Sequence, residues 1–518
     1  MMTFDVVVIG AGPVGLLLAC ELRLAGARPL VLERRAEPAR TPKANGLAGQ
    51  IVRVLGYRGL LDRFRAEASF SGPFPSFPFG SVMLNLATLD ASPLLGMAIQ
   101  QPRIEALLGE RARELDVPIR RAHELLALAQ DDETVTLEVR GPDGDVRLNA
   151  RYLVGCDGAR SLVREQAGIG FPGTTDPEVL RLGHFIAPEA GGLGDDPDFE
   201  VPGIGRLRPG WNRTPRGRFV VTSLQPGLHL VGVREDDPSA AGLTTPATVD
   251  DFRAAVRRVV GADLPLGEPV WLSRTVTQAR LAEAYRAGRV LLAGDAAHLF
   301  PAGGSSLNVG LLEAVNLGWK LAAEIRGDAP AGLLDTYHAE RHPAAARTLM
   351  QTRAQAVLDR VAGEDGTALR DLLAELLQFP EPLRHVAELL DGSDVRYAMP
   401  GGGDHPLVGR LVPDLPLTTT AGATRVAELL HPGRPLLLDL ADTPGVRDAA
   451  GAWTDRITVH TAGCDQPPAG ALLVRPDGYV AWAAPAASPG KGLREALSSW
   501  LGPASRLAEL PNQQEDRC

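Results

Sequence analysis

Apolar residues near the start of the chain fall in short continuous runs separated by turns. Residues 4–9 are apolar apart from Asp5, a glycine-rich turn follows, and the residues after it have the spacing of a buried helix. A second apolar run, PLVLE, ends on Glu33. Continuous apolar runs are typical of strands buried on both faces of a parallel sheet. The pattern predicts a strand, a glycine turn, a helix and a second strand.

Two later apolar runs end on an aspartate. ARYLVGCDG ends at Asp157 and Gly158, and GRVLLAGD ends at Gly294 and Asp295. Open α/β sheets bind their ligands at the carboxyl ends of the strands, so Asp295 is predicted at the ligand-binding edge. The loop PAGGSSLN follows Asp295 and runs into a helical stretch from about Val309, an arrangement typical of a ligand-binding turn against a helix N-terminus.

Alternating runs mark a different kind of sheet in the middle of the chain. RFVVTSLQPGLHLVGVRE and EPVWLSRTV have the two-residue period of strands with one buried face. We expect residues 73–97 and 173–279 to form an inserted antiparallel-sheet substrate domain. Residues 1–72, 98–172 and 280–390 then form one discontinuous α/β domain.

The stretch FSGPFPSFPFG contains four phenylalanines and three prolines at residues 70–80. An aromatic cluster at this place can line a hydrophobic substrate pocket, or it can be ordinary core beneath a loop. Both interpretations are compatible with the pattern.

The pattern changes again from about residue 395. RPLLLDLA, DRITVHTAG and GALLVRPDGYVAWAA predict strands, while RVAELL and GLREALSSWLG predict helices. Residues 395–518 are therefore predicted to form a separate βαβ-ββα domain. This part contains no CxxC pair, which excludes dithiol chemistry and leaves a packing or dimer-forming role.

Composition and charge exclude several classes of protein. The chain has 518 residues, enough for two or three domains, and a net charge of −10. A nucleic-acid-binding protein would need a basic face. The four cysteines form no metal or disulfide pattern, which fits a reduced cytoplasmic location. The apolar N-terminus lacks a basic leader and is too short to span a bilayer, so we expect no membrane partner.

The glycine-rich turn carries the most specific chemistry. Gly10, Gly12 and Gly15 have the GxGxxG spacing in which the glycines allow a tight turn, close approach of a pyrophosphate and close helix packing. Glu33, at the end of the second strand, is placed to accept hydrogen bonds from ribose hydroxyls. A strand, a helix and an acid in register favour dinucleotide binding. Arg34 follows the acid, where a cation can meet a phosphate or an adenine.

These motifs resemble those of the class A flavoprotein monooxygenases. GAGPVG at 10–15, Glu33-Arg34, CDGARSLVR and LLAGDAAH with PAGG and LN occur in that order, and the likeness extends over nearly the whole chain. It is greatest to the actinomycete hydroxylases of aromatic polyketides. The resemblance implies a Rossmann-type FAD-binding domain, an inserted antiparallel-sheet substrate domain and a C-terminal thioredoxin-like domain.

The resemblance also implies the residues that bind FAD. Gln101 would contact the cofactor's linker with Arg103 close by, Leu125 would lie by the adenine, and Asp295 would bind the ribityl chain. Lys43 stands where the family usually has arginine, and Ser306 stands where it usually has glycine. The complete expected FAD-binding set is Gly10, Gly12, Pro13, Val14, Gly15, Glu33, Arg34, Lys43, Gln101, Arg103, Leu125, Asp157, Asp295, Pro301, Gly304, Ser305, Ser306, Leu307 and Asn308.

The implied reaction is an oxygenation that depends on NAD(P)H and O2. The family reduces FAD with transiently bound NAD(P)H and transfers oxygen from a flavin C4a-hydroperoxide to a hydrophobic substrate, here a polyketide. Baeyer–Villiger oxygenation would look nearly identical in sequence. A non-redox [4+2] cyclase on the same scaffold is the alternative, and we identify neither a catalytic residue nor a metal ligand. His298 fits a catalytic base or a hydrogen-bonded core histidine.

Overall fold

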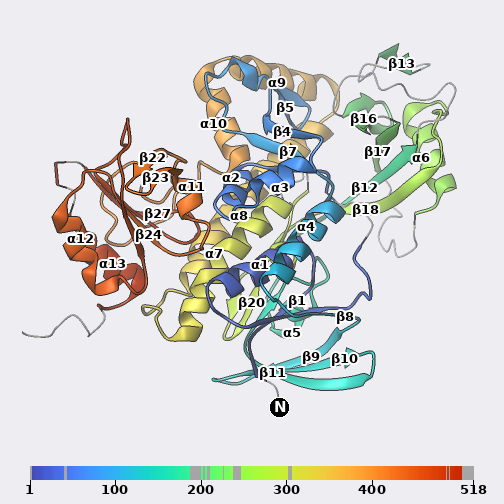
Figure 1. The fold of residues 1–518 in the computed structure, drawn as a ribbon. Helices are drawn as coiled ribbons and strands as arrows, with labels where there is room; N and C mark the ends of the chain where they lie inside the picture. Colours follow the sequence, from blue (N-terminus) through green and yellow to red (C-terminus); the bar gives the residue numbers. More distant parts are fainter. Residues whose placement is uncertain are drawn as a thin grey trace, which may run out of the picture.

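The computed structural model describes residues 3–39, 44–186, 200–201, 205–206, 211–225, 227–236, 247–301, 306–485, 487–488 and 490–504. A largely parallel sheet in the order β19-β20-β11-β1-β2-β8 lies in the lower part of Figure 1. The strands are β1 (Thr3–Ile9), β2 (Pro29–Glu33), β8 (Ile119–Arg121), β11 (Gly144–Gly155), β19 (Arg286–Ala287) and β20 (Val290–Leu292). Strands β9 (Glu124–Gln130) and β10 (Val135–Gly141) extend it as an antiparallel hairpin against β11.

The central strands of this sheet are buried on both faces. Val6, Val7 and Val8 of β1 have no exposed surface, as the continuous apolar run predicts. Helix α1 (Pro13–Leu24) packs between α7 (Ser306–Arg326) and α4 (Gln101–Glu114). Helix α7 begins at Ser306, three residues earlier than its sequence indicates. The helices α2 (Gln50–Gly56), α3 (Leu61–Ala66), α5 (Leu162–Gln166) and α8 (Thr336–Arg360) complete this part.

The inserted sheet is antiparallel, in the order β15-β16-β17-β12-β18-β21. Its strands are β12 (Gly173–Ile186), β15 (Asn212–Thr214), β16 (Gly217–Gln225), β17 (Leu228–Asp236), β18 (Pro269–Leu281) and β21 (His298–Leu299), and β13 (Glu200–Val201) pairs separately with β14 (Gly205–Arg206). One face is covered by α6 (Val249–Val260), a helix that the strand pattern alone did not predict. Thr248 caps α6, and Phe252, Val256 and Val259 bury its apolar stripe.

Residues 73–97 do not hydrogen-bond to that sheet. Strands β3 (Leu47–Ala48), β4 (Phe70–Pro73) and β7 (Leu95–Ala98) form a small sheet, while β5 (Phe77–Phe79) pairs only with β6 (Val82–Leu84). The turn η1 (Leu86–Thr88) and these strands share a core with α8, α9 (Gly363–Leu376) and α10 (Pro380–Asp391). This segment therefore rests on the helices that follow the parallel sheet.

The C-terminal part lies at the left of Figure 1 and has its own four-stranded sheet, β25-β24-β26-β27. Strands β24 (Leu436–Asp439) and β25 (Thr458–Thr461) are parallel, and β26 (Ala471–Val474) and β27 (Val480–Ala484) are antiparallel, so the predicted βαβ-ββα order is present. Helices α12 (Pro444–Ala450) and α13 (Leu493–Leu501) pack on it, and β22 (Pro416–Thr419), β23 (Gly422–Arg425) and α11 (Val426–Leu429) precede it. No described helix is both long and apolar enough to cross a bilayer.

A buried group of charges joins this part to helices α7 and α8. Glu340 of α8 accepts bonds from Arg475 at 2.6 and 2.8 Å and from Lys320 of α7 at 2.7 Å. Asp477 and Asn316 complete the group, and all five side chains are at least nine-tenths buried. Burial alone would raise the pKa of Glu340, but the charges of Arg475 and Lys320 outweigh it and lower the pKa to about 2.

We expect Glu340→Gln to lower the free energy of unfolding by about 3–5 kcal/mol, because it removes the buried carboxylate that Lys320 and Arg475 share and leaves Arg475 with Asp477 alone. The folded-state pKa of Glu340 lies below its ordinary value of 4.5, so its contribution is present above that pH and is lost as the pH falls toward 2. Denaturant titrations from pH 4.5 down to about 2 should show that the free energy of unfolding falls less in the variant than in the wild type. Glu138→Gln, in an exposed pair with Arg147, is the control; an equal loss in both variants would contradict the assignment.

Candidate functional site

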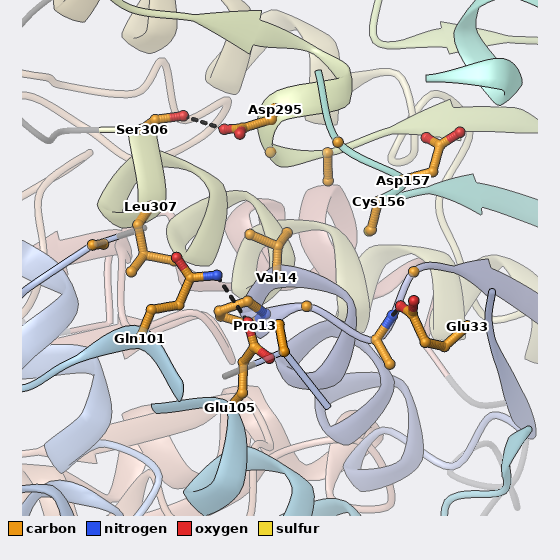
Figure 2. A pocket seen from close by; sticks show the side chains of 18 of the residues that line it. Pro13, Val14, Glu33, Gln101, Glu105, Cys156, Asp157, Asp295, Ser306 and Leu307 are labelled. Atoms are coloured by element: carbon orange, nitrogen blue, oxygen red, sulfur yellow. Dashed lines mark hydrogen bonds between the residues drawn. The ribbon is translucent and has the colours of Figure 1, made fainter. Parts of the chain in front are cut away.

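A cavity of about 920 Å³ opens at the carboxyl edge of the parallel sheet. Its lining comes from loops that are far apart in the sequence: the glycine turn after β1, the end of β2, the start of α4, the Asp157 loop, and Asp295 with the start of α7 (Figure 2). The edge predicted to bind a ligand is thus the one that is hollowed.

The glycine turn depends on the absence of side chains. Gly10 has a φ of +107°, and a Cβ on it would overlap the carbonyl oxygen of Cys156. A Cβ on Gly15 would overlap the carbonyl oxygen of Gly10, so this third glycine lets α1 pack against the turn. Gly12 has open space around it and lines the cavity. These are the three separate tasks that the spacing predicts.

Glu33 organises the turn from the end of the neighbouring strand. Its carboxylate accepts a bond from the backbone N–H of Ala11 at 2.8 Å and another from that of Arg35 at 3.0 Å. Each oxygen keeps a free lone pair, because a carboxylate accepts about four bonds. Glu33 and Arg34 both line the cavity, so a polyhydroxylated or anionic group can be held here.

Three helices begin at the cavity wall. Pro13 and Val14 of α1, Gln101 of α4, and Ser306 of α7 are first-turn residues that line it. None of these helices has an acidic residue in its first turn, and α1 and α4 lack side-chain caps. The dipoles of these helices add positive potential at the cavity wall. The cavity therefore favours a ligand with negative charge at more than one point.

Two buried oxygens of the lining have no hydrogen-bond partner among the described residues. They are Asn45 Oδ1 and Asp157 Oδ1. The other Asp157 oxygen accepts from the N–H of Val163 at 3.2 Å. Burial raises the pKa of the Asp157 carboxyl, and its hydrogen bonds oppose that shift. Orphaned buried oxygens are costly, so a ligand with N–H or O–H donors fits this wall.

Ser306 contacts Asp295 directly. Its hydroxyl donates to Asp295 Oδ1 at 2.5 Å, and both residues line the cavity (Figure 2). Asn308 Oδ1 accepts from the N–H of Ala48 at 3.1 Å, which fixes the start of α7 against β3. The hydroxyl of Ser306 is therefore hydrogen-bonded to Asp295, so the two side chains form one polar group on the cavity wall.

A buried pair lies beneath the turn η3 (Gly294–Ala296) that carries Asp295. Glu313 of α7 accepts from the N–H of Gly294 at 2.8 Å, and His298 Nε2 lies 3.1 Å from both of its oxygens. His298 is fully buried and stacks on Phe300, with ring centroids 4.6 Å apart. It does not line the cavity, so it acts as a core histidine and not as a base on a bound molecule.

Comparison with known proteins identifies the family. Residues 3–352 match the FAD binding domain family, and residues 405–504 match the aromatic-ring hydroxylase C-terminal family. A 12-dehydrotetracycline 5-monooxygenase/anhydrotetracycline 6-monooxygenase of Streptomyces rimosus is 45% identical over 514 residues, covering 97% of this chain and 99% of its own. The chain belongs to the class A FAD-dependent monooxygenases.

The likeness extends to solved structures and to one relative with another activity. The anhydrotetracycline hydroxylase OxyS of Streptomyces rimosus superposes with a TM-score of 0.87 at 42% identity, over 97% of this chain and all of that one. The dialkyldecalin synthase of Streptomyces rugosporus is 39% identical over 506 residues, covering 97% of this chain and 100% of its own. Both matches cover 97% of this chain.

FAD fits the cavity of this monooxygenase. The glycine turn and the start of α1 suit its pyrophosphate, Glu33 suits a ribose, and the orphaned oxygens of Asn45 and Asp157 suit hydroxyl or N–H donors. Thirteen of the residues expected from the sequence line the cavity: Gly10, Gly12, Pro13, Val14, Glu33, Arg34, Gln101, Leu125, Asp157, Asp295, Ser306, Leu307 and Asn308.

Other expected residues lie elsewhere. Gly15 packs beneath the turn, and Pro301 is buried without lining the cavity. Arg103 projects from α4 toward Glu67, whose Oε1 lies 2.6 Å from its guanidinium, because it is two positions from Gln101 and so on another face of the helix. The expected contacts of Lys43, Gly304 and Ser305 lie outside the described residues.

Several residues of the site were missed from the sequence. Glu105 lines the cavity and accepts from Gln101 at 2.8 Å, one helical turn away. Asn45 lies in a loop with no periodic signal. Glu313 had a usable signal, since it is the acid within the apolar run VGLLEAV, and a buried acid needs a specific partner.

We expect Ser306→Gly to change the rate of flavin reduction or reoxidation and to weaken FAD binding about 2- to 12-fold, the worth of one ordinary hydrogen bond. Ser306→Ala removes the hydroxyl without adding backbone freedom and should weaken FAD similarly. Fluorescence titration of the apoprotein with FAD and stopped-flow flavin kinetics measure the two effects. Thr367→Ala, an exposed helix hydroxyl in α9, is the control. Unchanged binding and kinetics in both Ser306 variants would show that the hydroxyl is dispensable.

Proposed function

We propose that this monooxygenase uses NAD(P)H and O2 to hydroxylate a planar, polycyclic intermediate of a polyketide-type pathway. One observation carries the proposal: the cavity that presents three helix N-termini is also lined by Phe74, Phe77, Met97 and Thr222. An anionic cofactor and an apolar aromatic molecule can share such a space. The Streptomyces rimosus relative, named for tetracycline precursors, supports the substrate class.

We propose the cofactor contacts that the family resemblance implies for residues that line the cavity. Gly10, Gly12 and the start of α1 would face the pyrophosphate, and Glu33 would accept from the adenosine ribose. Asp295, with Ser306, would accept from the ribityl chain. Leu125 and Arg34 would lie near the adenine, and Gln101, held by Glu105, would reach the linker. Lys43 stays a prediction from the sequence as a cation on the flavin side.

The bound flavin would supply electron transfer and oxygen activation, which no side chain provides. The chain's own contribution is positioning and electrostatics. The dipole at the N-terminus of α7, whose own first turn contains no acidic residue, would help to stabilise negative charge on the reduced cofactor. The neighbouring apolar side chains exclude water from the reacting atoms. Thr222 of the inserted sheet lines the cavity and carries a hydroxyl group.

The division into domains follows from the same proposal. Residues 1–72, 98–172 and 280–390 would bind FAD, while 73–97 and 173–279 would bind substrate. We regard residues 395–518 as a thioredoxin-like domain without dithiol chemistry, because the βαβ-ββα order is present and CxxC is absent. Its role is then packing, and a homodimer through this domain is the assembly to examine. We expect the protein to act in the cytoplasm.

A non-redox [4+2] cyclisation is the second candidate, favoured by the likeness to the dialkyldecalin synthase. The cavity would then orient a flexible substrate by shape, with the cofactor as part of the wall. Baeyer–Villiger oxygenation remains within the first candidate, because it needs the same reduced flavin and O2.

Anaerobic mixing of the yellow holoprotein with NADPH or NADH distinguishes the two candidates. We expect the visible flavin absorbance to bleach, faster when an aromatic polyketide is present, and to return when air is admitted with formation of an oxygenated product. Conversion of a substrate while the flavin never bleaches would contradict the monooxygenase proposal and favour cyclisation.

A further inference from the structure

Three phenylalanine rings of the segment 70–79 follow one another toward the cavity. Phe70 is 38% exposed, and its ring stacks on that of Phe74 at a centroid distance of 5.3 Å and an interplanar angle of 25°. The Phe74 ring lies 5.1 Å from that of Phe77. Phe74 and Phe77 line the cavity and are half-buried. The row therefore runs from solvent to the cavity.

The row is held by a glycine on the neighbouring strand. The N–H of Phe74 donates to the carbonyl of Leu94 at 3.2 Å, and β4 pairs with β7 so that Gly72 lies opposite Gly96. A Cβ on Gly96 would overlap the Phe74 ring, and no other residue is among the nearest atoms. Gly96 is thus the residue that lets the ring lie flat against β7.

Among the residues that the structure describes, the strands around this row contribute no charged side chain to the lining. The segments β3, β4–β5, β7 and β16 contribute Leu47, Ala48, Phe74, Phe77, Pro78, Met97, Ala98 and Thr222. Thr222 is the one member of this set with a polar side chain. This lining suits a planar, apolar ligand with a hydroxyl or carbonyl group within reach of Thr222. Offset-stacked aromatic rings attract one another, and an apolar ligand can be buried against an uncharged wall without desolvating a charge.

We propose that Phe70, Phe74 and Phe77 form an aromatic wall along which a planar polycyclic substrate enters and lies, and that Gly96 sets the width of the cavity at this wall. The inference rests on the proposed function, whose substrate class it specifies. Phe74 and Phe77 act as specificity-determining residues through stacking. Gly96 is a positioning residue, since it acts through Phe74.

The wild-type holoenzyme is titrated with phenol, 1-naphthol, 1-hydroxyanthraquinone and anhydrotetracycline, and binding is followed by the change in flavin absorbance. We expect affinity to rise with the number of fused rings. Phe74→Leu should weaken anhydrotetracycline about 2- to 12-fold by removing the stacked ring. Gly96→Ala should weaken anhydrotetracycline binding at least about fivefold while phenol binds as before. The new methyl group displaces the Phe74 ring, which then occupies cavity space that only the larger ligand needs.

Phe79→Leu is the matched control, because Phe79 lies in the same segment but is buried in the core formed with α8–α10 and does not line the cavity. It should lower thermal stability without changing ligand affinity. Any loss of stability in Gly96→Ala should disappear when Phe74→Ala is also present, because the overlapping ring is gone. The FAD dissociation constant should stay unchanged in every variant.

Affinity that does not rise with ring number, including no binding at all, would overturn the inference. So would equal effects of Phe74→Leu and Phe79→Leu on ligand binding. The proposed function fails on a separate result, namely a flavin that neither NADPH nor NADH bleaches under any condition.

Discussion

Three segments of backbone approach one another at the cavity so closely that a Cβ atom at the crossing points would overlap a neighbouring segment. The turn after β1 touches the strand end at Cys156, and α1 touches the same turn through Gly15. On the other side, a Cβ on Gly310 of α7 would lie 2.8 Å from Val14 and 2.9 Å from the Cα of Gly294. Glycine at these crossings brings two helix N-termini and two strand ends to one place. The rest of the site depends on this approach.

That approach adds fixed positive charge to a cavity that is also lined by Arg34, Arg35, Arg121 and Arg160. The helices supply partial positive charge from fixed backbone groups, which need no reorganisation when an electron pair arrives. Glu313 stabilises the arrangement from below, because its carboxylate holds the N–H of Gly294 and the ring of His298. A negative charge thus lies behind the turn, while the positive ends of the helices face the ligand.

Strong local patterns predicted most of the fold. The parallel strands, the glycine turn and the βαβ-ββα tail each have a period or a turn signal of their own, and their strands lie where the pattern places them. Helix α6 was missed although its sequence has an N-cap residue, Thr248, and a C-cap glycine, Gly261. It lies between alternating runs that predict strands, and its apolar spacing was not recognised as helical. The family resemblance implied that Arg103 lies close to the cofactor, whereas its guanidinium bonds to Glu67 and does not line the cavity.

The remaining site residues depend on tertiary contacts that a sequence does not encode locally. The bond from Ser306 to Asp295 crosses a loop, and Asn45 and Phe74 reach the cavity only through the packing of small strands. The aromatic segment left two interpretations open, and the structure contains both, since Phe74 and Phe77 face the cavity while Phe79 is core. Phe77 and Phe79 are two positions apart in β5 and share a face, so strand period does not separate them; depth does, since Phe77 is half-buried and Phe79 is buried.

The charge group around Glu340 has a consequence for how the protein is made. Lys320 and Glu340 leave the ribosome well before Arg475 and Asp477, the residues that complete their shell. Until about 135 further residues have been added, a separation that spans Glu340 to Arg475, the nascent helices carry an incomplete set of buried charges. The complete charge group, which holds α7 and α8 to the C-terminal part, can therefore form only after Arg475 and Asp477 have been made.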